Sequence, residues 1–255
     1  MSGHIRLSVE DAVARVTLCN PAKFNAMSRV MWRELRKLFN ELPQRDDVRA
    51  VLLAGEGGHF CAGGDIAEYT DFRFHPDGLR DFHEGDVWGG LSAMLACDLP
   101  VIAQIEGHCM GAGVEMASCC DIRLAGQSAR FGAPIAKLGF PMAPREAELV
   151  AREVGLVTAR QMLLEAAVLD APTMLARGFL QDVLPDADVH TEALERALRV
   201  VRLAPQAARM NKQVLRAWAD GQGVQTLLAT AYDYADSFEH REGIAAFLAK
   251  RTPRF

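Results

Sequence analysis

The chain has 255 residues, of which half are hydrophobic and about a quarter are charged. That composition is typical of a globular protein with one large domain, or one domain and an appendage. The net charge of −5 and the lack of a Lys/Arg cluster argue against a nucleic-acid partner. The N-terminus lacks the apolar stretch of a signal peptide, and no run of about 18 apolar residues occurs, so we expect a cytoplasmic protein without a membrane span.

The first elements are predicted from hydrophobic spacing. Alternation between Ile5 and Leu18 predicts a β-hairpin that turns at Glu10-Asp11. The sequence NPAKFNAMS, residues 20–28, predicts a loop that ends in Ser28 as a helix N-cap. Apolar residues from Val30 to Leu42 then recur at helical spacing and predict a helix that stops near Pro43.

Strands and helices alternate after that helix. Segment 48–55 predicts a buried strand and segment 56–66 a glycine-rich loop, and a helix is expected through Leu91 and Leu95. After Pro100 come a second buried strand, a glycine turn, a helix and the strand DIRLAG. This order predicts an α/β fold with parallel strands. From about residue 144 the pattern is almost wholly helical, and we expect an α/β core over 1–190 and a helical region over 191–255.

Six cysteines occur in mostly apolar surroundings and form no CxxC pair: Cys19, Cys61, Cys97, Cys109, Cys119 and Cys120. They are predicted to be small buried hydrophobic residues in a reducing compartment. Two of them lie beside histidines, as His59 with Cys61 and His108 with Cys109. That spacing matches no common zinc pattern, so no metal site is expected.

A faint internal repeat relates residues 50–66, AVLLAGEGGHFCAGGDI, to residues 100–116, PVIAQIEGHCMGAGVEM. Each copy is an apolar strand, a glycine-rich turn and an acidic residue that enters a helix. Two such turns side by side can direct two backbone N–H groups at one oxygen, which is an oxyanion hole. A dinucleotide site is excluded because Met116 stands where GxGxxG needs its last glycine.

Glu115 follows the second turn and has two interpretations. Next to an oxyanion hole that holds a thioester carbonyl, its carboxylate could move protons at the α- or β-carbon. Alternatively it only complements the partial positive charge of the helix N-terminus, a contribution of roughly 0.3–1 kcal/mol. The spacing alone does not choose between them.

Several ordered motifs resemble the crotonase family, also called the enoyl-CoA hydratase/isomerase superfamily. They are the loop NPAKFNAMS and the segments FCAGGDI (60–66), EGHCMGAGVEMASCCDI (106–122), FGAP (131–134) and EGIAAFLAKRTPRF (242–255). The resemblance covers essentially the whole chain. It implies a spiral core of repeated β-β-α units, a C-terminal helical region that forms homotrimers or hexamers, and acyl-CoA thioester substrates. It implies no metal or redox cofactor, since coenzyme A is part of the substrate.

The resemblance also implies roles for individual residues. The oxyanion hole falls on the N–H groups of Gly64 and Ala112, and Glu115 matches one of the two acid/base glutamates of the hydratases. Residues of two early segments match the coenzyme A contacts: Lys23, Phe24, Ala26, Ala62, Asp65 and Ile66. Phe247 and Lys250 match a phenylalanine and a lysine that reach coenzyme A, commonly from a neighbouring subunit.

One half of the site departs from the family pattern. The second hydratase glutamate is replaced by Ile135, and the usual P-G-x-G-G stretch reads PMAPRE. Nearby charged residues are expected to be surface or packing residues rather than replacements: His108, Lys137, Arg145, Glu146 and Glu148. For Asp71 and His75, in the loop after the first turn, the sequence does not decide between a role in the site and a surface position. Four aromatic residues are candidates for the acyl pocket: Phe72, Phe74, Phe82 and Trp88.

Three functions therefore remain for the sequence. The first is an acyl-CoA enzyme, nominally an enoyl-CoA hydratase, that stabilises a thioester enolate and uses Glu115. The second is a one-glutamate double-bond isomerase or decarboxylase. The third is a protein that binds coenzyme A esters with little catalysis. Because isoleucine neither donates nor accepts a proton, Ile135 predicts poor hydration of crotonyl-CoA.

Overall fold

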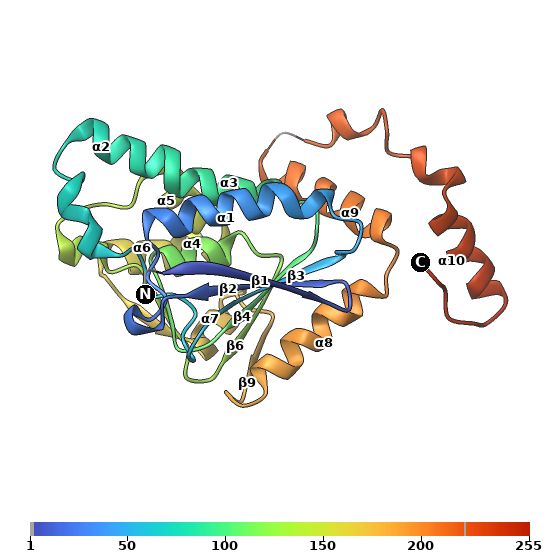
Figure 1. The fold of residues 1–255 in the computed structure, drawn as a ribbon, viewed down its shortest axis with the longest axis horizontal. Helices are drawn as coiled ribbons and strands as arrows, with labels where there is room; N and C mark the ends of the chain where they lie inside the picture. Colours follow the sequence, from blue (N-terminus) through green and yellow to red (C-terminus); the bar gives the residue numbers. More distant parts are fainter. Residues whose placement is uncertain (1–2, 222) are drawn as a thin grey trace.

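A six-stranded sheet forms the centre of the computed structural model, which describes residues 3–221 and 223–255 (Figure 1). Its strands, in spatial order, are β1 (His4–Glu10), β2 (Val13–Cys19), β3 (Ala50–Gly55), β4 (Val101–Ile105), β6 (Ile122–Gly126) and β9 (Asp182–Leu184). Strands β1 and β2 are antiparallel and the other neighbours are parallel. The predicted hairpin and parallel α/β core are confirmed.

A second, small sheet has the order β5 (His108–Met110), β7 (Arg130–Gly132), β8 (Val168–Asp170). Each of its strands has three residues, too few to show a hydrophobic period. The expectation that the chain is almost wholly helical after residue 144 is therefore wrong at β8 and β9, and β5 was not distinguished from the glycine turn around it.

Helices cover one face of the main sheet: α1 (Arg29–Glu41), α3 (Trp88–Ala96), α4 (Ala112–Ser118) and α5 (Pro144–Val154) (Figure 1). Helix α1 begins where it was predicted, because Ser28 Oγ accepts a hydrogen bond from Met31 N at 3.2 Å. It ends just before a 3₁₀ turn, η2 (Leu42–Gln44), that contains Pro43. Trp32, Leu35 and Phe39 bury its apolar face against the core.

A helical segment over residues 66–87 leads into α3. It consists of the 3₁₀ helix η3 (Ile66–Asp71), the short helix α2 (Pro76–Arg80) and a π-helical turn, η4 (Asp81–Val87). Figure 1 shows it beyond the end of the sheet near the N-terminus. We call residues 66–87 the lid segment.

The opposite face of the sheet packs on α8 (Val189–Val201), where Ala193 and Ala197 contact a group of buried residues that includes Leu52, Ile102 and Leu124. Helices α6 (Leu156–Leu164) and α7 (Ala171–Ala176) follow α5. The boundary expected between residues 190 and 191 falls inside α8, and the division into two regions stays a prediction.

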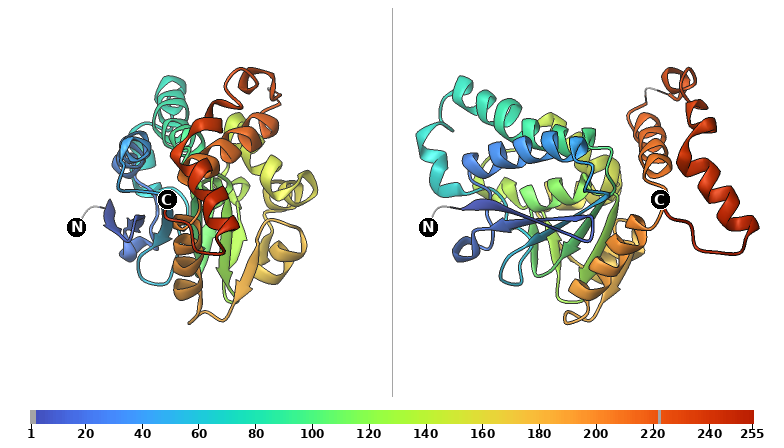
Figure 2. Two further views of the ribbon diagram at one scale, coloured as in Figure 1. Left: turned by 90° about the vertical axis from the view of Figure 1, so that its right-hand side faces the viewer. Right: turned by 45° about the vertical axis from the view of Figure 1, so that its right-hand side comes forward.

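The C-terminal helices α9 (Pro205–Ala219) and α10 (Phe238–Leu248) extend away from the sheet (Figure 2). Two 3₁₀ turns, η6 (Gln225–Leu227) and η7 (Asp233–Asp236), lie between them. Large apolar side chains are exposed here, among them Trp218 at 76% and Phe247 at 81%. An apolar surface of this kind usually marks an interface, but the assembly itself stays a prediction.

All six cysteines are buried and none is in a disulfide, as expected for small hydrophobic residues. Within residues 3–221 and 223–255, no helix is both long and apolar enough to cross a membrane. The same residues contain no group of three or more His, Cys, Asp or Glu side chains with the arrangement of a metal site.

Candidate active site

The two glycine turns of the repeat lie side by side. Cys61 N donates to His108 O and Met110 N donates to Cys61 O, each at 2.8 Å, so Cys61 pairs with Cys109 in a parallel bridge. A Cβ placed on Gly111 would lie 3.6 Å from Gly63 Cα. The repeat therefore brings its two turns together, as the sequence predicted.

Each turn contains a residue that lines the cavity and whose backbone N–H group makes no hydrogen bond to a described residue. Gly111, with a φ of 48°, is the N-cap of α4. Ala112 is therefore the first helical residue, and its N–H group has no partner in the helix. On the other turn, Gly63 O and Asp65 N both bond to Met27, and Gly64 lies between them. Among the described residues, neither Gly64 N nor Ala112 N donates a hydrogen bond.

Glu115 lies one turn into α4 and is only 6% exposed. Burial raises the pKa of its carboxyl group well above the ordinary value, and the nearby charge of Glu146 raises it further. A carboxyl group that favours its neutral form complements a helix dipole poorly. A raised pKa is instead what a general acid/base near neutral pH requires.

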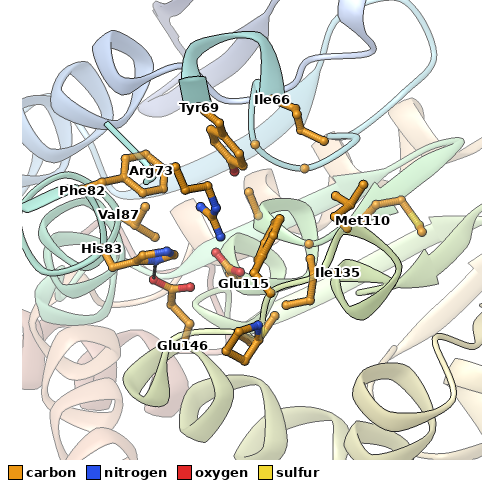
Figure 3. A pocket seen from close by; sticks show the side chains of 18 of the residues that line it. Ile66, Tyr69, Arg73, Phe82, His83, Val87, Met110, Glu115, Ile135 and Glu146 are labelled. Carbon is orange, nitrogen blue, oxygen red and sulfur yellow. Dashed lines mark hydrogen bonds and ion pairs between the residues drawn. The ribbon is translucent and has the colours of Figure 1, made fainter. Parts of the chain in front are cut away.

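A cavity of about 290 Å³ joins these groups (Figure 3). Gly64, Ala112 and Glu115 all line it. The other side chains that line the cavity come mainly from the lid segment and from residues 134–146. They include Tyr69, Arg73, Phe82, His83, Val87, Ile135, Phe140 and Glu146.

Glu146 was expected to be a surface or packing residue, and the structure places it away from the surface. It lies in the first turn of α5, is only 3% exposed and lines the same cavity as Glu115. His83 Nδ1 lies 2.7 Å from Glu146 Oε1 (Figure 3). In the sequence, Glu146 is only the third residue of a helix that begins with Pro144, and an acidic residue is common in the first turn of a helix.

Of the other four nearby charged residues, only Lys137 lines the cavity. Glu148 and Arg145 are exposed, and Arg145 pairs with Glu84 at 3.1 Å. The ring of His108 stacks on that of His59 at 4.6 Å outside the cavity. Lys137 is exposed but lines the cavity.

Of the four aromatic residues predicted for the acyl pocket, only Phe82 lines the cavity. Phe72 is buried in the core, Phe74 is 79% exposed, and Trp88 packs against the core next to Arg145. None of these three lines the cavity, so the expectation is wrong for them. The open candidates Asp71 and His75 are exposed and do not line it either. Sequence reasoning missed Tyr69, Arg73, His83 and Phe140, whose positions depend on how the lid segment folds.

The side chain of Tyr69 packs against the turn that contains Gly64. A Cβ placed on Gly64 would lie 2.1 Å from Tyr69 Oη, so only glycine leaves space for the hydroxyl group. Burial raises the pKa of Tyr69 to about 12, so the hydroxyl group stays protonated and able to donate a hydrogen bond.

The residues expected to contact coenzyme A form one group beside the first turn. Lys23 Nζ pairs with Asp65 Oδ2 at 2.6 Å, and Ala62 N donates to Phe24 O at 2.9 Å. Phe24 is about half exposed next to this contact. Ala26 is buried, while Ile66 is exposed and lines the cavity. The structure brings these residues together, and their role as ligands stays a prediction.

Phe247 and Lys250 do not join that group within one chain. Phe247 lies in α10 and Lys250 follows it, and both are exposed on the part of the chain farthest from the lid segment (Figures 1 and 2). This separation agrees with the expectation that they act on a neighbouring subunit, which a single chain does not test.

The fold and the cavity define an α/β protein with two adjacent free amides and two buried carboxyl groups. Residues 8–255 match the family model described as enoyl-CoA hydratase/isomerase. The chain therefore belongs to the enoyl-CoA hydratase/isomerase family, and the predicted crotonase-like fold is confirmed. Members of this family act on acyl-CoA thioesters.

Individual relatives agree with that assignment. The chain is 30% identical over 249 residues to a protein of Mycobacterium bovis named "Probable enoyl-CoA hydratase", covering 96% of this chain and 95% of the relative. It is 31% identical to the 2,3-dehydroadipyl-CoA hydratase of Escherichia coli, covering 98% and 97%. A crystal structure of an enoyl-CoA hydratase/carnithine racemase from Magnetospirillum magneticum is 35% identical, with a TM-score of 0.94 over 98% of this chain and 94% of that one.

Proposed function

We propose that the protein adds water to 2-enoyl-CoA thioesters. The observation that carries this proposal is the single cavity that holds two free backbone N–H groups and two buried carboxyl groups. The N–H groups of Gly64 and Ala112 would bind the thioester oxygen as negative charge develops on it. The water oxygen bonds to the β-carbon as Glu146 takes a proton from the water, and the neutral carboxyl group of Glu115 donates a proton to the α-carbon.

In this proposal Glu146 supplies the second carboxyl group that Ile135 lacks. Hydration needs one group that activates water and one that handles the α-proton, held in different protonation states. Two features support Glu146 in this role: its charge raises the pKa of Glu115, and it has an imidazole partner in His83. The proposal therefore replaces the expectation of poor hydration that rested on Ile135 alone.

A second candidate is a double-bond isomerase. Ile135 gives the cavity an apolar wall at the position where a hydratase glutamate was expected, which favours a dry site. One carboxyl group that takes a proton from the α-carbon and returns it at the γ-carbon needs no water. Glu115 would then act alone, and Glu146 would be a fixed partner of His83.

A panel of acyl-CoA thioesters separates these reactions. Hydration is followed by loss of the enoyl-thioester absorbance, isomerisation by chromatography of the products, and decarboxylation by release of CO₂ from carboxylated thioesters. Hydration of short 2-enoyl-CoA esters supports the proposal. Isomerisation or CO₂ release without hydration contradicts it in favour of the alternative reactions, and binding without turnover favours a non-catalytic protein.

The proposal includes a homotrimer or hexamer and no metal or redox cofactor. The exposed apolar side chains of α9 and α10 support the assembly, because isolated helices rarely leave such a surface uncovered. Light scattering should give a trimer or hexamer at micromolar concentration, and a monomer would contradict it. Lys250→Ala should weaken binding of coenzyme A esters if this lysine reaches their phosphates from a neighbouring subunit.

A further inference from the structure

Arg73 places a positive charge in the cavity wall. It follows η3 in the lid segment, and its guanidinium group lies 3.6 Å from the ring centre of Phe140 and 4.4 Å from that of Tyr69. Figure 3 shows it directed into the space between Tyr69 and Glu115. Aromatic contacts on a guanidinium group hold its plane and leave its N–H groups available at the edge.

One nitrogen of this group has no partner. Arg73 Nη1 is buried and makes no hydrogen bond within residues 3–221 and 223–255. Burial also lowers the pKa of Arg73 from its ordinary value, an effect that the charge of Glu146 only partly opposes. A buried N–H donor without an acceptor is costly, and its presence in a binding cavity calls for an acceptor that arrives with the ligand.

Other arginines that contact the lid segment are satisfied within the chain. Arg29 Nε and Arg33 Nε pair with the buried carboxylate of Asp86 at 2.5 and 2.7 Å. Glu146, whose buried carboxyl group lines the same cavity as Arg73, pairs with His83 at 2.7 Å. Asp86 does not line the cavity, whereas Arg73 does. The unsatisfied donor therefore lies in the cavity wall and not among the ion pairs that hold the lid segment to the core.

We propose that the acyl chain of the substrate ends in a second carboxylate, which Arg73 binds through its free N–H groups. This inference rests on the proposed function, because it places the thioester at Gly64 and Ala112. An arginine fork pairs with a carboxylate through two charge-assisted hydrogen bonds, which gives both affinity and orientation. Lys137, which also lines the cavity, adds a second positive charge.

The test compares matched pairs of short 2-enoyl-CoA esters. Each pair has the same chain length and ends either in a methyl group or in a carboxylate, and the methyl ester of the carboxylate serves as a third substrate. For the best chain length, kcat/KM should be about 10- to 100-fold higher for the carboxylate than for either uncharged substrate. The difference should lie mainly in KM, because the pairing with the carboxylate is the same in the bound substrate and in the transition state.

Two variants and a control assign the effect to Arg73. Arg73→Met should remove the preference, while uncharged substrates keep most of their turnover, and Arg73→Lys should retain part of it. Arg80→Met is the matched control, because Arg80 is an exposed arginine of the lid segment that does not line the cavity. Thermal unfolding of each variant checks that the lid segment is intact.

Two outcomes would overturn the inference while the proposed hydration stands. One is equal kcat/KM for charged and uncharged chains at every length. The other is an Arg73→Met variant that loses the same factor on all substrates, which would make Arg73 a structural group or a partner of the catalytic carboxyl groups. If the protein hydrates nothing, calorimetry with saturated acyl-CoA esters, with and without a terminal carboxylate, tests Arg73 separately.

Discussion

The two walls of the cavity are built in different ways. One wall is backbone, contributed by the paired turns around Gly64 and Ala112 and fixed by strand-like hydrogen bonds between them. The other wall is side chain, contributed by the lid segment and by residues 134–146, which have no strand pairing.

This difference separates two tasks. The backbone wall offers N–H groups that suit any thioester carbonyl, whatever the acyl chain. The side-chain wall carries His83, Glu146 and Arg73, which under the proposed function would set whether water is activated and which acyl chain fits. Substitutions on the backbone wall should therefore affect every substrate, and substitutions on the side-chain wall should affect particular reactions or substrates.

The largest effect is expected at Glu115, which lies in the helix that follows the second turn and lines the cavity. Glu115→Gln should lower turnover by about 10²- to 10⁴-fold on all substrates while folding and the affinity for coenzyme A esters change little. Glutamine has nearly the same shape but exchanges no proton. Steady-state kinetics and exchange of α-protons with deuterated solvent measure the effect, and an equally active variant would return Glu115 to a purely structural role.

Glu146→Gln tests the side-chain wall. Hydration should fall by about 10²-fold, because the second carboxyl group is lost, while α-proton exchange through Glu115 continues. Glu148→Gln is the matched control, since Glu148 is exposed two residues further along the same helix. Unchanged hydration in both variants would limit Glu146 to holding His83.

Ile135→Glu extends that test. If the cavity can use a carboxyl group at the position expected from the family, adding this substitution to Glu146→Gln should restore part of the hydration. No recovery, in a variant that folds and binds coenzyme A esters normally, would show that the site is shaped around Glu146.

The backbone wall was predictable from sequence and the side-chain wall largely was not. The repeat over 50–66 and 100–116 predicts two adjacent turns, because glycines and apolar strands are local signals. Glu146 and Arg73 carry no such signal. Each lies in a helical segment where a charged residue is ordinary, and only the packing of α5 and the lid segment turns them toward the cavity.

A smaller loss than at Glu115 is expected from Gly64→Ala. The new Cβ would lie 2.1 Å from Tyr69 Oη, so either the tyrosine or the turn must shift, and the N–H of residue 64 would lose its alignment. Turnover should fall by about 10²-fold on all substrates. Gly85→Ala is the control, because a Cβ there would have its nearest neighbour at 3.4 Å.

Tyr69→Phe sharpens this result. Combined with Gly64→Ala it removes the clashing oxygen and should recover part of the lost activity. If the double variant is no better than Gly64→Ala alone, the loss comes from the turn itself or from a requirement for the tyrosine hydroxyl group, and Tyr69→Phe alone distinguishes these two causes.

The smallest effect is on stability and follows from the raised pKa of Glu115. Between pH 4.5, the ordinary value for a glutamate, and the raised folded-state pKa, the unfolded chain releases a proton that the folded chain keeps. The folded state therefore loses stability as pH rises through this window, by about 1.4 kcal/mol for each unit of pKa difference. Glu115→Gln has no proton to lose, so its stability relative to the wild type should increase from pH 5 to pH 8.

Guanidinium unfolding midpoints across this range measure the difference between the two proteins. Glu148→Gln should follow the wild type, since Glu148 is exposed. Glu146→Gln removes the repulsion that helps raise the pKa of Glu115, so that only burial raises this pKa. The pH range over which the folded state loses stability should then end at a lower pH. Parallel pH curves for Glu115→Gln and the wild type would mean that Glu115 is ionised in the folded protein. The two carboxyl groups would then not divide the roles of acid and base in the way proposed.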